Sequence, residues 1–235
     1  MGGSLILKAF ILALAQIGDP RFRRVLWLGI LLSLALLVAA YAGVLWLIHA
    51  LAGAEATLPI LGEVQWLDDL LGWASLLFML LLSMFLMIPV ASAITSMFLD
   101  DVAQAVEDRH YPALPPAQKV GLGEALRDTV NFLGVLIGAN LLALILYAFF
   151  PPTAPFIFYA LNGFLLGREY ITLAAMRRIG RTGARALRAQ HRGTIWAAGV
   201  LMALPLSIPV VNLVVPILGA ATFTHLFHGL RGERL

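Results

Sequence analysis

Long stretches without a charged side chain are the feature that most constrains this sequence. Residues 25–51 and 70–99 contain no Asp, Glu, Lys or Arg. Each stretch is longer than the roughly 20 apolar residues with which a helix crosses the hydrocarbon layer of a bilayer. Over the whole chain 61% of the residues are hydrophobic and 12% are charged, whereas about a quarter of the residues of a soluble domain are charged. The sequence therefore predicts an all-α, polytopic integral membrane protein with transmembrane helices at 25–51 and 70–99.

Two further apolar segments, 131–176 and 194–228, contain prolines and are predicted to form helical hairpins. The second is shorter than the roughly 40 residues that two complete spans and a turn require. It therefore favours a re-entrant hairpin, whose broken backbone must be covered by protein or face a wet cavity. Residues 5–17 are predicted to form an interfacial helix at the membrane surface, and residues 100–128 a polar cytoplasmic link. No linker divides the chain, so we predict a single membrane domain over all 235 residues.

The positions of the basic residues predict the topology. Arginines precede the first span, form a block at 177–192 and recur near the C-terminus. Because cytoplasmic loops carry an excess of Lys and Arg, both termini are expected in the cytoplasm. The same rule explains why the chain is basic, so we predict no nucleic-acid partner.

Catalytic motifs are missing from the sequence. It contains no cysteine, which excludes disulfides, thiolate catalysis and Cys-based zinc sites. It also contains no Ser/His/Asp order, Gly-rich phosphate loop or HExxH motif, so nothing indicates an enzyme or a cofactor. His225 and His228 have the one-turn spacing of metal ligands. No nearby acidic or His residue completes the ligand set, and the only further candidate, Glu233, is distant. We therefore predict no metal site.

The first candidate binding site lies just before the first predicted span, where Pro20 is followed by Arg21, Arg23 and Arg24. Guanidinium groups bind oxyanions through paired hydrogen bonds, and the free N–H groups of a helix start add positive potential. Together they are suited to sulfate or phosphate. The alternative interpretation is a topology signal that contacts lipid phosphate.

A second group of arginines recurs at spacings of 3, 4, 3 and 4. This spacing predicts one helical face lined by cations: Arg178, Arg181, Arg185, Arg188 and Arg192, with Arg177 beside them. Anionic lipid headgroups are the expected partner of the segment from Arg177 to Arg192, since polybasic segments next to a membrane attract such lipids. A vestibule for anions is the alternative.

Four polar side chains within apolar segments are candidates for lining a pathway. Arg168 and Glu169 lie within or at the end of such a segment, where charges are costly and tend to face protein or water. Asn162 precedes them, and Asn212 lies among prolines that leave carbonyl groups unpaired. The alternative role is a structural hydrogen-bond clamp for Asn162, Arg168 and Glu169, and a structural turn for Asn212.

Four blocks of the sequence resemble one known family. They are Pro20 with Arg23 and Arg24, the link that begins Phe98-Leu99-Asp100-Asp101, the block Asn-Gly-Phe-Leu-Leu-Gly-Arg-Glu-Tyr at 162–170, and the block at 209–220 that begins Pro-Val-Val-Asn-Leu. Together they are similar to the CysZ sulfate-transport family of the etoposide-induced-protein superfamily, over nearly the whole chain. The resemblance implies a homo-oligomeric sulfate permease or channel of the bacterial inner membrane that supplies cysteine synthesis. It also implies two full spans, two partially penetrating hairpins, and a sulfate site that uses Arg23, Arg24 and nearby backbone N–H groups.

We therefore predict sulfate uptake by a passive or weakly coupled route. No nucleotide-binding motif is present to supply energy, and Glu169 is the one membrane carboxylate suited to proton coupling. The alternative function is that of a non-transporting membrane scaffold or assembly factor whose arginines bind anionic lipids.

Overall fold

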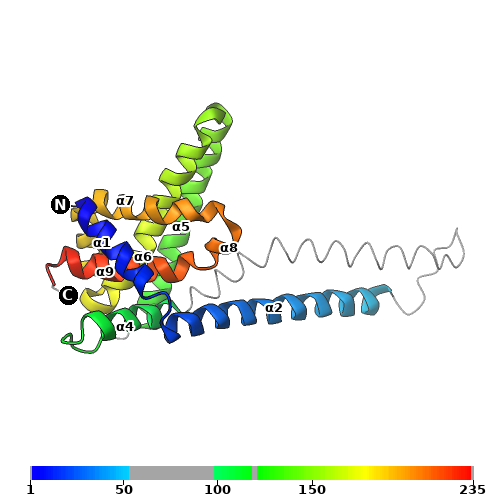
Figure 1. Ribbon diagram of the computed structural model, residues 1–235. Coiled ribbons are helices and arrows are strands. Elements are labelled where there is room, and N and C mark those ends of the chain that lie inside the picture. The colour runs from blue at the N-terminus through cyan, green and yellow to red at the C-terminus, as the bar shows by residue number, and fades with distance from the viewer. Residues whose placement is uncertain (1, 53–97, 118–120, 234–235) are drawn as a thin grey trace, which may run out of the picture. The chain divides into compact units, whose positions relative to one another are not determined.

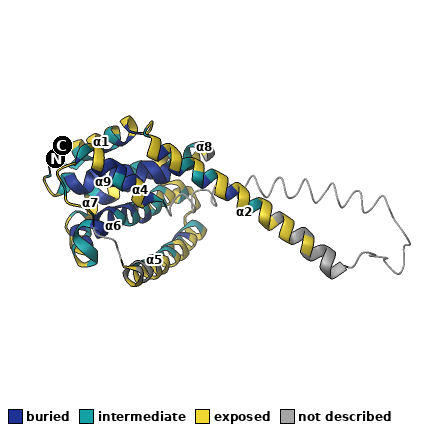
Figure 2. Ribbon diagram, turned by 90° about the horizontal axis from the view of Figure 1, so that it is seen from below, coloured by how far each residue is buried: buried dark blue, intermediate teal, exposed yellow. Residues whose placement is uncertain are grey.

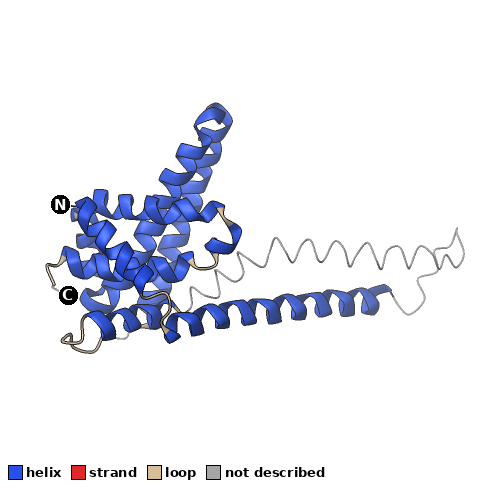
Figure 3. Cartoon of the chain, in the orientation of Figure 1, coloured by secondary structure: helices blue, strands red, loops and turns tan. Residues whose placement is uncertain are grey.

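A computed structural model of the chain describes residues 2–52, 98–117 and 121–233. These residues form helices and no strands (Figure 3), which confirms the predicted all-α class. The helices are α1 (Gly2–Ala15), α2 (Pro20–Ala52), α4 (Leu99–His110), α5 (Leu122–Phe149), α6 (Ala154–Gln190), α7 (Arg192–Ala203), α8 (Pro209–Asn212) and α9 (Val215–Leu230), with short 3-10 turns at Pro151–Thr153 and Leu204–Ser207. The predicted span at 70–99 lies almost wholly outside the described residues.

The chain groups into two compact units, one of Met1–Leu26 with Ser96–Leu235 and the other of Trp27–Thr95. Everything described below about the core and the candidate site lies in the first unit. The single membrane domain stays a prediction.

Two helical segments are long and apolar enough to cross a membrane, by length and composition: Pro20–Ala40 of α2 and Val130–Phe149 of α5. The first overlaps the predicted span at 25–51 over residues 25–40. The second is the first arm of the predicted hairpin at 131–176, and only 6% of it is buried. Figure 2 shows α5 as a mainly exposed helix, and its exposed side chains are mostly Leu, Ile and Phe. Such a surface suits contact with lipid, while the depth of the hairpins stays a prediction.

Helix α1 packs along α9 with its small residues. Ala9 and Ala13 are buried, whereas Leu7, Ile11 and Leu14 on the other side are exposed. Intervals of three and four residues place these three side chains on one face. The helix therefore has one face against protein and one apolar face left over, as an interfacial helix requires.

Helix α9 forms the centre of the first unit, and α1, α4, α6 and α7 pack around it (Figure 1). Every residue from Val215 to His228 is buried, as expected for a helix that is apolar on all sides. Helices α7 and α9 have 12 and 16 residues, fewer than the roughly 20 that a crossing requires. Their lengths agree with the argument that 194–228 is too short for two spans.

Helices α6 and α7 approach each other closely through glycines. A Cβ atom on Gly199 of α7 would lie 1.9 Å from the carbonyl oxygen of Gly163, and one on Gly167 would lie 2.7 Å from the carbonyl oxygen of Ile195. Rising numbers on α6 meet falling numbers on α7, so the two helices are antiparallel. Small residues at four-residue intervals are the usual means of such close packing in membrane proteins.

Replacing Gly199 with alanine is expected to destabilise the protein by about 1–3 kcal/mol, because the added methyl group meets backbone atoms that cannot move aside. Thermal unfolding of the purified protein in detergent measures the effect. Gly138→Ala in α5 is the matched control, since no atom lies within 4 Å of a Cβ built there. Equal stability of the two variants would contradict the close α6–α7 contact.

Helix α6 is broken at Gly180, which has φ 66° and ψ −179°. Residues with a Cβ atom are strained in this region of backbone space, and glycine is not. After the break the chain folds back, because Arg188 Nη1 donates a hydrogen bond of 2.8 Å to Thr172 Oγ1, 16 residues earlier. A straight helix would hold these residues about 24 Å apart. The predicted single cationic face is therefore wrong, since Gly180 separates Arg178 from the arginines that follow.

Candidate anion-binding site

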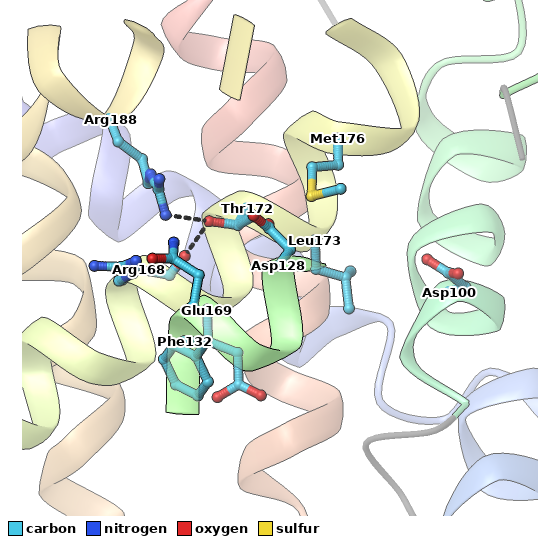
Figure 4. Close-up of a pocket in the computed structure, with 10 residues that line it drawn as sticks. Asp100, Asp128, Phe132, Arg168, Glu169, Thr172, Leu173, Met176 and Arg188 are labelled. Carbon is cyan, nitrogen blue, oxygen red and sulfur yellow. Dashed lines mark hydrogen bonds between the residues drawn. The ribbon is translucent and has the colours of Figure 1, made fainter. Parts of the chain in front are cut away.

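Arg168 and Arg188 are brought together by the break at Gly180 and line two adjoining cavities. Both side chains are half-buried. Thr172 links them, since its hydroxyl accepts a hydrogen bond from Arg188 and donates one of 2.5 Å to the carbonyl oxygen of Arg168 (Figure 4). Two guanidinium groups that are 20 residues apart in sequence thus share one place in the fold.

The first cavity, here called the Thr172 cavity, has a volume of about 300 Å³. Helices α4, α5 and α6 contribute its walls. The lining residues are Asp100, Asp128, Asn131, Phe132, Arg168, Glu169, Thr172, Leu173, Met176 and Arg188. Two guanidinium groups and the amide of Asn131 therefore offer hydrogen-bond donors to an anion, whereas the hydroxyl proton of Thr172 is already donated to Arg168.

Three carboxylates also line the Thr172 cavity. Asp128 is paired with Arg181, whose Nε lies 3.0 Å from its Oδ1. In Figure 4 Asp100 lies on α4, at the opposite edge of the view from Arg168. Glu169 forms no ion pair with any residue that the structure describes. Arg168 and Arg188 therefore lie together in the part of the view away from Asp100, with Glu169 next to Arg168 in the chain.

The second cavity, here called the Trp196 cavity, has a volume of about 390 Å³, and none of the described residues that line it is acidic. It is lined by Phe164, Arg168, Arg185, Arg188, Ala189, Arg192, Ile195 and Trp196. Burial and the charge of Arg168 lower the pKa of the Arg188 guanidinium, although a guanidinium remains charged at neutral pH. Like charges thus face one another here, and a bound anion would relieve their repulsion.

Two of the four predicted pathway residues, Arg168 and Glu169, line the Thr172 cavity. The other two line neither cavity. Asn162 Nδ2 donates a hydrogen bond of 2.8 Å to the carbonyl oxygen of Phe158, one turn earlier in the same helix. Asn212 ends α8 and lines neither cavity. The alternative role, structural hydrogen bonding, thus describes Asn162 better than a pathway does.

The arginines at the start of α2 lie apart from these cavities. Arg21 pairs with Asp108 at 2.5 Å, and the backbone N–H of Arg21 donates a hydrogen bond of 2.9 Å to Asp19 Oδ1. This carboxylate caps one of the N–H groups that a helix start offers to an anion. The side chains of Arg23 and Arg24 are exposed. The sulfate site at Arg21, Arg23 and Arg24 stays a prediction.

Comparison with known proteins bears directly on this arrangement. A sequence model of one family, described as sulfate transporter CysZ/etoposide-induced protein 2.4, matches residues 9–216. The chain belongs to this family. No curated protein sequence matches the chain significantly. The matched residues include all the residues that line both cavities. Arg168 and Arg188 therefore lie within the part of the chain that matches the family. The family is one of transporters and not of enzymes.

A cluster of buried charges around Glu107 was missed by the sequence analysis of this CysZ/etoposide-induced-protein chain. Glu107 is 2% exposed, and it accepts hydrogen bonds from Nη2 and Nε of Arg178 at 2.6 and 2.9 Å. Arg177 Nη2 lies 3.4 Å from the same carboxylate, and His228 Nε2 lies 3.2 Å from it. The other ring nitrogen of His228 contacts Glu233. The cluster therefore joins α4, α6, α9 and the C-terminal segment.

The electrostatics of this cluster favour the ionised form of Glu107. Burial raises the pKa of the carboxyl, but hydrogen bonds from His228 and Arg178 and the charges of both arginines outweigh burial and lower the pKa to about 2. Arg177 and Arg178 are only 7% and 9% exposed in their side chains. The lipid contact of the segment from Arg177 to Arg192 stays a prediction, while the guanidinium groups of Arg177 and Arg178 face an internal carboxylate.

Proposed function

We propose that this chain carries sulfate across the bacterial inner membrane and so supplies cysteine biosynthesis. The observation that carries the proposal is the pair of half-buried guanidinium groups of Arg168 and Arg188 in the Thr172 cavity. Membership of a family described by sulfate transport supports the choice of anion. The protein then works as a multi-pass homo-oligomer with both termini in the cytoplasm.

The donors around the Thr172 cavity match the chemistry of a tetrahedral oxyanion. A guanidinium presents parallel N–H groups that bind two oxygens of one anion, and Asn131 and Thr172 add neutral polar groups. A hydrogen bond to a charged group is worth roughly 1.5–3 kcal/mol. Two guanidiniums therefore offer several such hydrogen bonds to one bound sulfate.

The exposed Arg23 and Arg24 form a second proposed sulfate contact, at the start of α2. Exposed cations raise the local concentration of anions and accelerate their association. In this scheme Arg21, Arg23 and Arg24 attract sulfate, while Arg168 and Arg188 bind it deeper in the fold. Transport is passive or weakly coupled. Glu169, next to Arg168 in the chain, is the carboxylate suited to proton coupling.

Sulfate flux tests the proposal. Purified wild-type protein in liposomes is expected to accelerate the uptake of radiolabelled sulfate above the rate of empty liposomes. Arg168→Gln is expected to slow this uptake at least tenfold, because it removes a charge-assisted contact worth more than 1.4 kcal/mol. Arg109→Gln is the matched control, since Arg109 is an exposed arginine of α4 that lines neither cavity.

Two outcomes of the flux experiment count against the proposal in different ways. Wild-type uptake no faster than in empty liposomes would rule out sulfate transport and favour the scaffold function. Equal uptake by Arg168→Gln and wild type would leave transport standing and remove the Thr172 cavity as its binding site.

A further inference from the structure

The Trp196 cavity combines two chemistries that a free inorganic anion does not use together. Four arginines, Arg168, Arg185, Arg188 and Arg192, line it without any acidic residue. The remaining wall is apolar and partly open, since Phe164 and Trp196 are 45% and 46% exposed. A strongly cationic end next to exposed aromatic rings has the character of a site for an anionic amphiphile.

The two kinds of side chain are sorted along the helices. On α6, Phe164 lies one turn before Arg168, and on α7, Trp196 lies one turn after Arg192. Because α6 and α7 are antiparallel, with Gly163 against Gly199 and Gly167 against Ile195, both aromatic residues are displaced from their arginines in the same direction. The cavity therefore has an arginine level and, one helical turn of about 5.4 Å away, an aromatic level.

This order matches the boundary of a membrane. Lipid phosphate groups attract arginines, and Trp side chains are enriched at the membrane–water interface, at the level of the headgroups. From Arg168 towards its N-terminus, α6 continues as an apolar segment with exposed Phe158 and Phe156. Acyl chains bound at this surface would extend from the arginine level along those rings.

We propose that the Trp196 cavity is a binding site for a phospholipid with two phosphates, of the diphosphatidylglycerol type. Four guanidinium groups provide two for each phosphate, the arrangement in which bidentate hydrogen bonds are strongest. The arginines come from three chain segments, the parts of α6 before and after Gly180 and the start of α7, so the headgroup would be contacted from three segments and not by one helix face. Neither Arg177 nor Arg178 takes part, since both contact Glu107.

Lipid retention tests this site. The full-length protein is purified in detergent, and its binding of tetraoleoyl diphosphatidylglycerol and of dioleoyl phosphatidylcholine is measured by native mass spectrometry. Wild type is expected to retain the diphosphate lipid at least tenfold more strongly than the phosphatidylcholine. Arg185→Gln with Arg192→Gln is expected to lose this preference, and Trp196→Ala to weaken retention severalfold. Arg109→Gln is the control for the loss of an exposed arginine outside the cavity.

Three results would overturn the proposal. The first is equal retention by Arg185→Gln/Arg192→Gln and Arg109→Gln. The second is unchanged retention by Trp196→Ala, which would remove the apolar part of the site. The third is binding of inorganic phosphate as tight as that of the lipid, which would make the cavity a site for free oxyanions. Arg185 and Arg192 are exposed, so folding is expected to be kept, and Arg192→Glu alone gives an independent variant with the same expected loss.

The lipid site shares Arg168 and Arg188 with the proposed sulfate site. Arg185 and Arg192 lie outside the Thr172 cavity, so variants of these two test the lipid site separately from sulfate transport. A protein that retains the diphosphate lipid as expected but moves no sulfate would contradict only the proposed function. A protein that moves sulfate with no lipid preference would contradict only the lipid site.

Discussion

Replacing Glu107 with alanine is expected to lower the free energy of unfolding by about 3–5 kcal/mol, the largest stability loss of the substitutions considered. The change removes the carboxylate that pairs with Arg178 and His228 and leaves their charged or polar groups buried without it. A buried charge without its partner costs far more than an exposed one. Denaturant unfolding of the purified protein in detergent measures the loss.

Asp108→Ala provides the matched control for Glu107→Ala. Asp108 is the next residue of α4 and also pairs with an arginine, Arg21, but this pair is about half exposed. Exposed pairs are worth roughly 0–1 kcal/mol, so this variant is expected to be nearly as stable as wild type. Similar losses in the two variants would contradict the internal role of Glu107.

Acid should reveal the same contribution of Glu107. Its pKa is about 2 in the folded protein and 4.5 as an ordinary value, so the stability it adds is complete above pH 4.5 and is lost as the pH falls towards 2. The stability difference between wild type and Glu107→Gln is therefore expected to shrink over that interval. Arg177 and Arg178 keep their charge throughout it.

Replacing Gly180 with alanine is expected to cost about 1–3 kcal/mol of stability and to weaken sulfate binding at least tenfold. The backbone at Gly180 has φ 66°, a region in which a side chain is strained. Relief of that strain straightens α6 and moves Arg188 away from Thr172 and Arg168. Thermal unfolding and equilibrium sulfate binding measure the two effects.

Gly193→Ala is the control for the break at Gly180. Gly180 precedes Arg181 and Gly193 follows Arg192, and neither glycine has an atom within 4 Å of a built Cβ. Gly193 differs in having no positive φ. Gly193→Ala is therefore expected to leave stability and sulfate binding nearly unchanged. A Gly180→Ala protein with wild-type sulfate affinity would show that the reversal does not position the arginines.

The sequence predicted those features that local patterns determine. Apolar runs and prolines identified α2, the α5–α6 pair and the α7–α9 segment, because length and hydrophobicity are properties of each segment alone. Arg168 and Glu169 were recognised for the same reason, since a charge in an apolar segment is visible without knowing its neighbours.

Contacts between distant residues could not be predicted in this way. The regular spacing of the arginines concealed the reversal at Gly180, which sends Arg178 to Glu107 and Arg188 to Thr172. Glu107 had one local signal: α4 also buries Leu99, Val102, Ala103 and Val106, a helical pattern that places Glu107 on the covered face. Its partners lie 71 and 121 residues away, and no periodicity reports such pairs.

Equilibrium binding of sulfate to the purified protein, measured by calorimetry, tests most directly whether Arg168 and Arg188 form the anion site. Arg188→Gln is expected to weaken sulfate binding at least tenfold, because it removes one of the two guanidiniums of the Thr172 cavity, while Arg109→Gln binds as wild type does. Unchanged sulfate affinity in Arg188→Gln, together with loss of binding in Arg23→Gln/Arg24→Gln, would contradict this account and place the site at the start of α2.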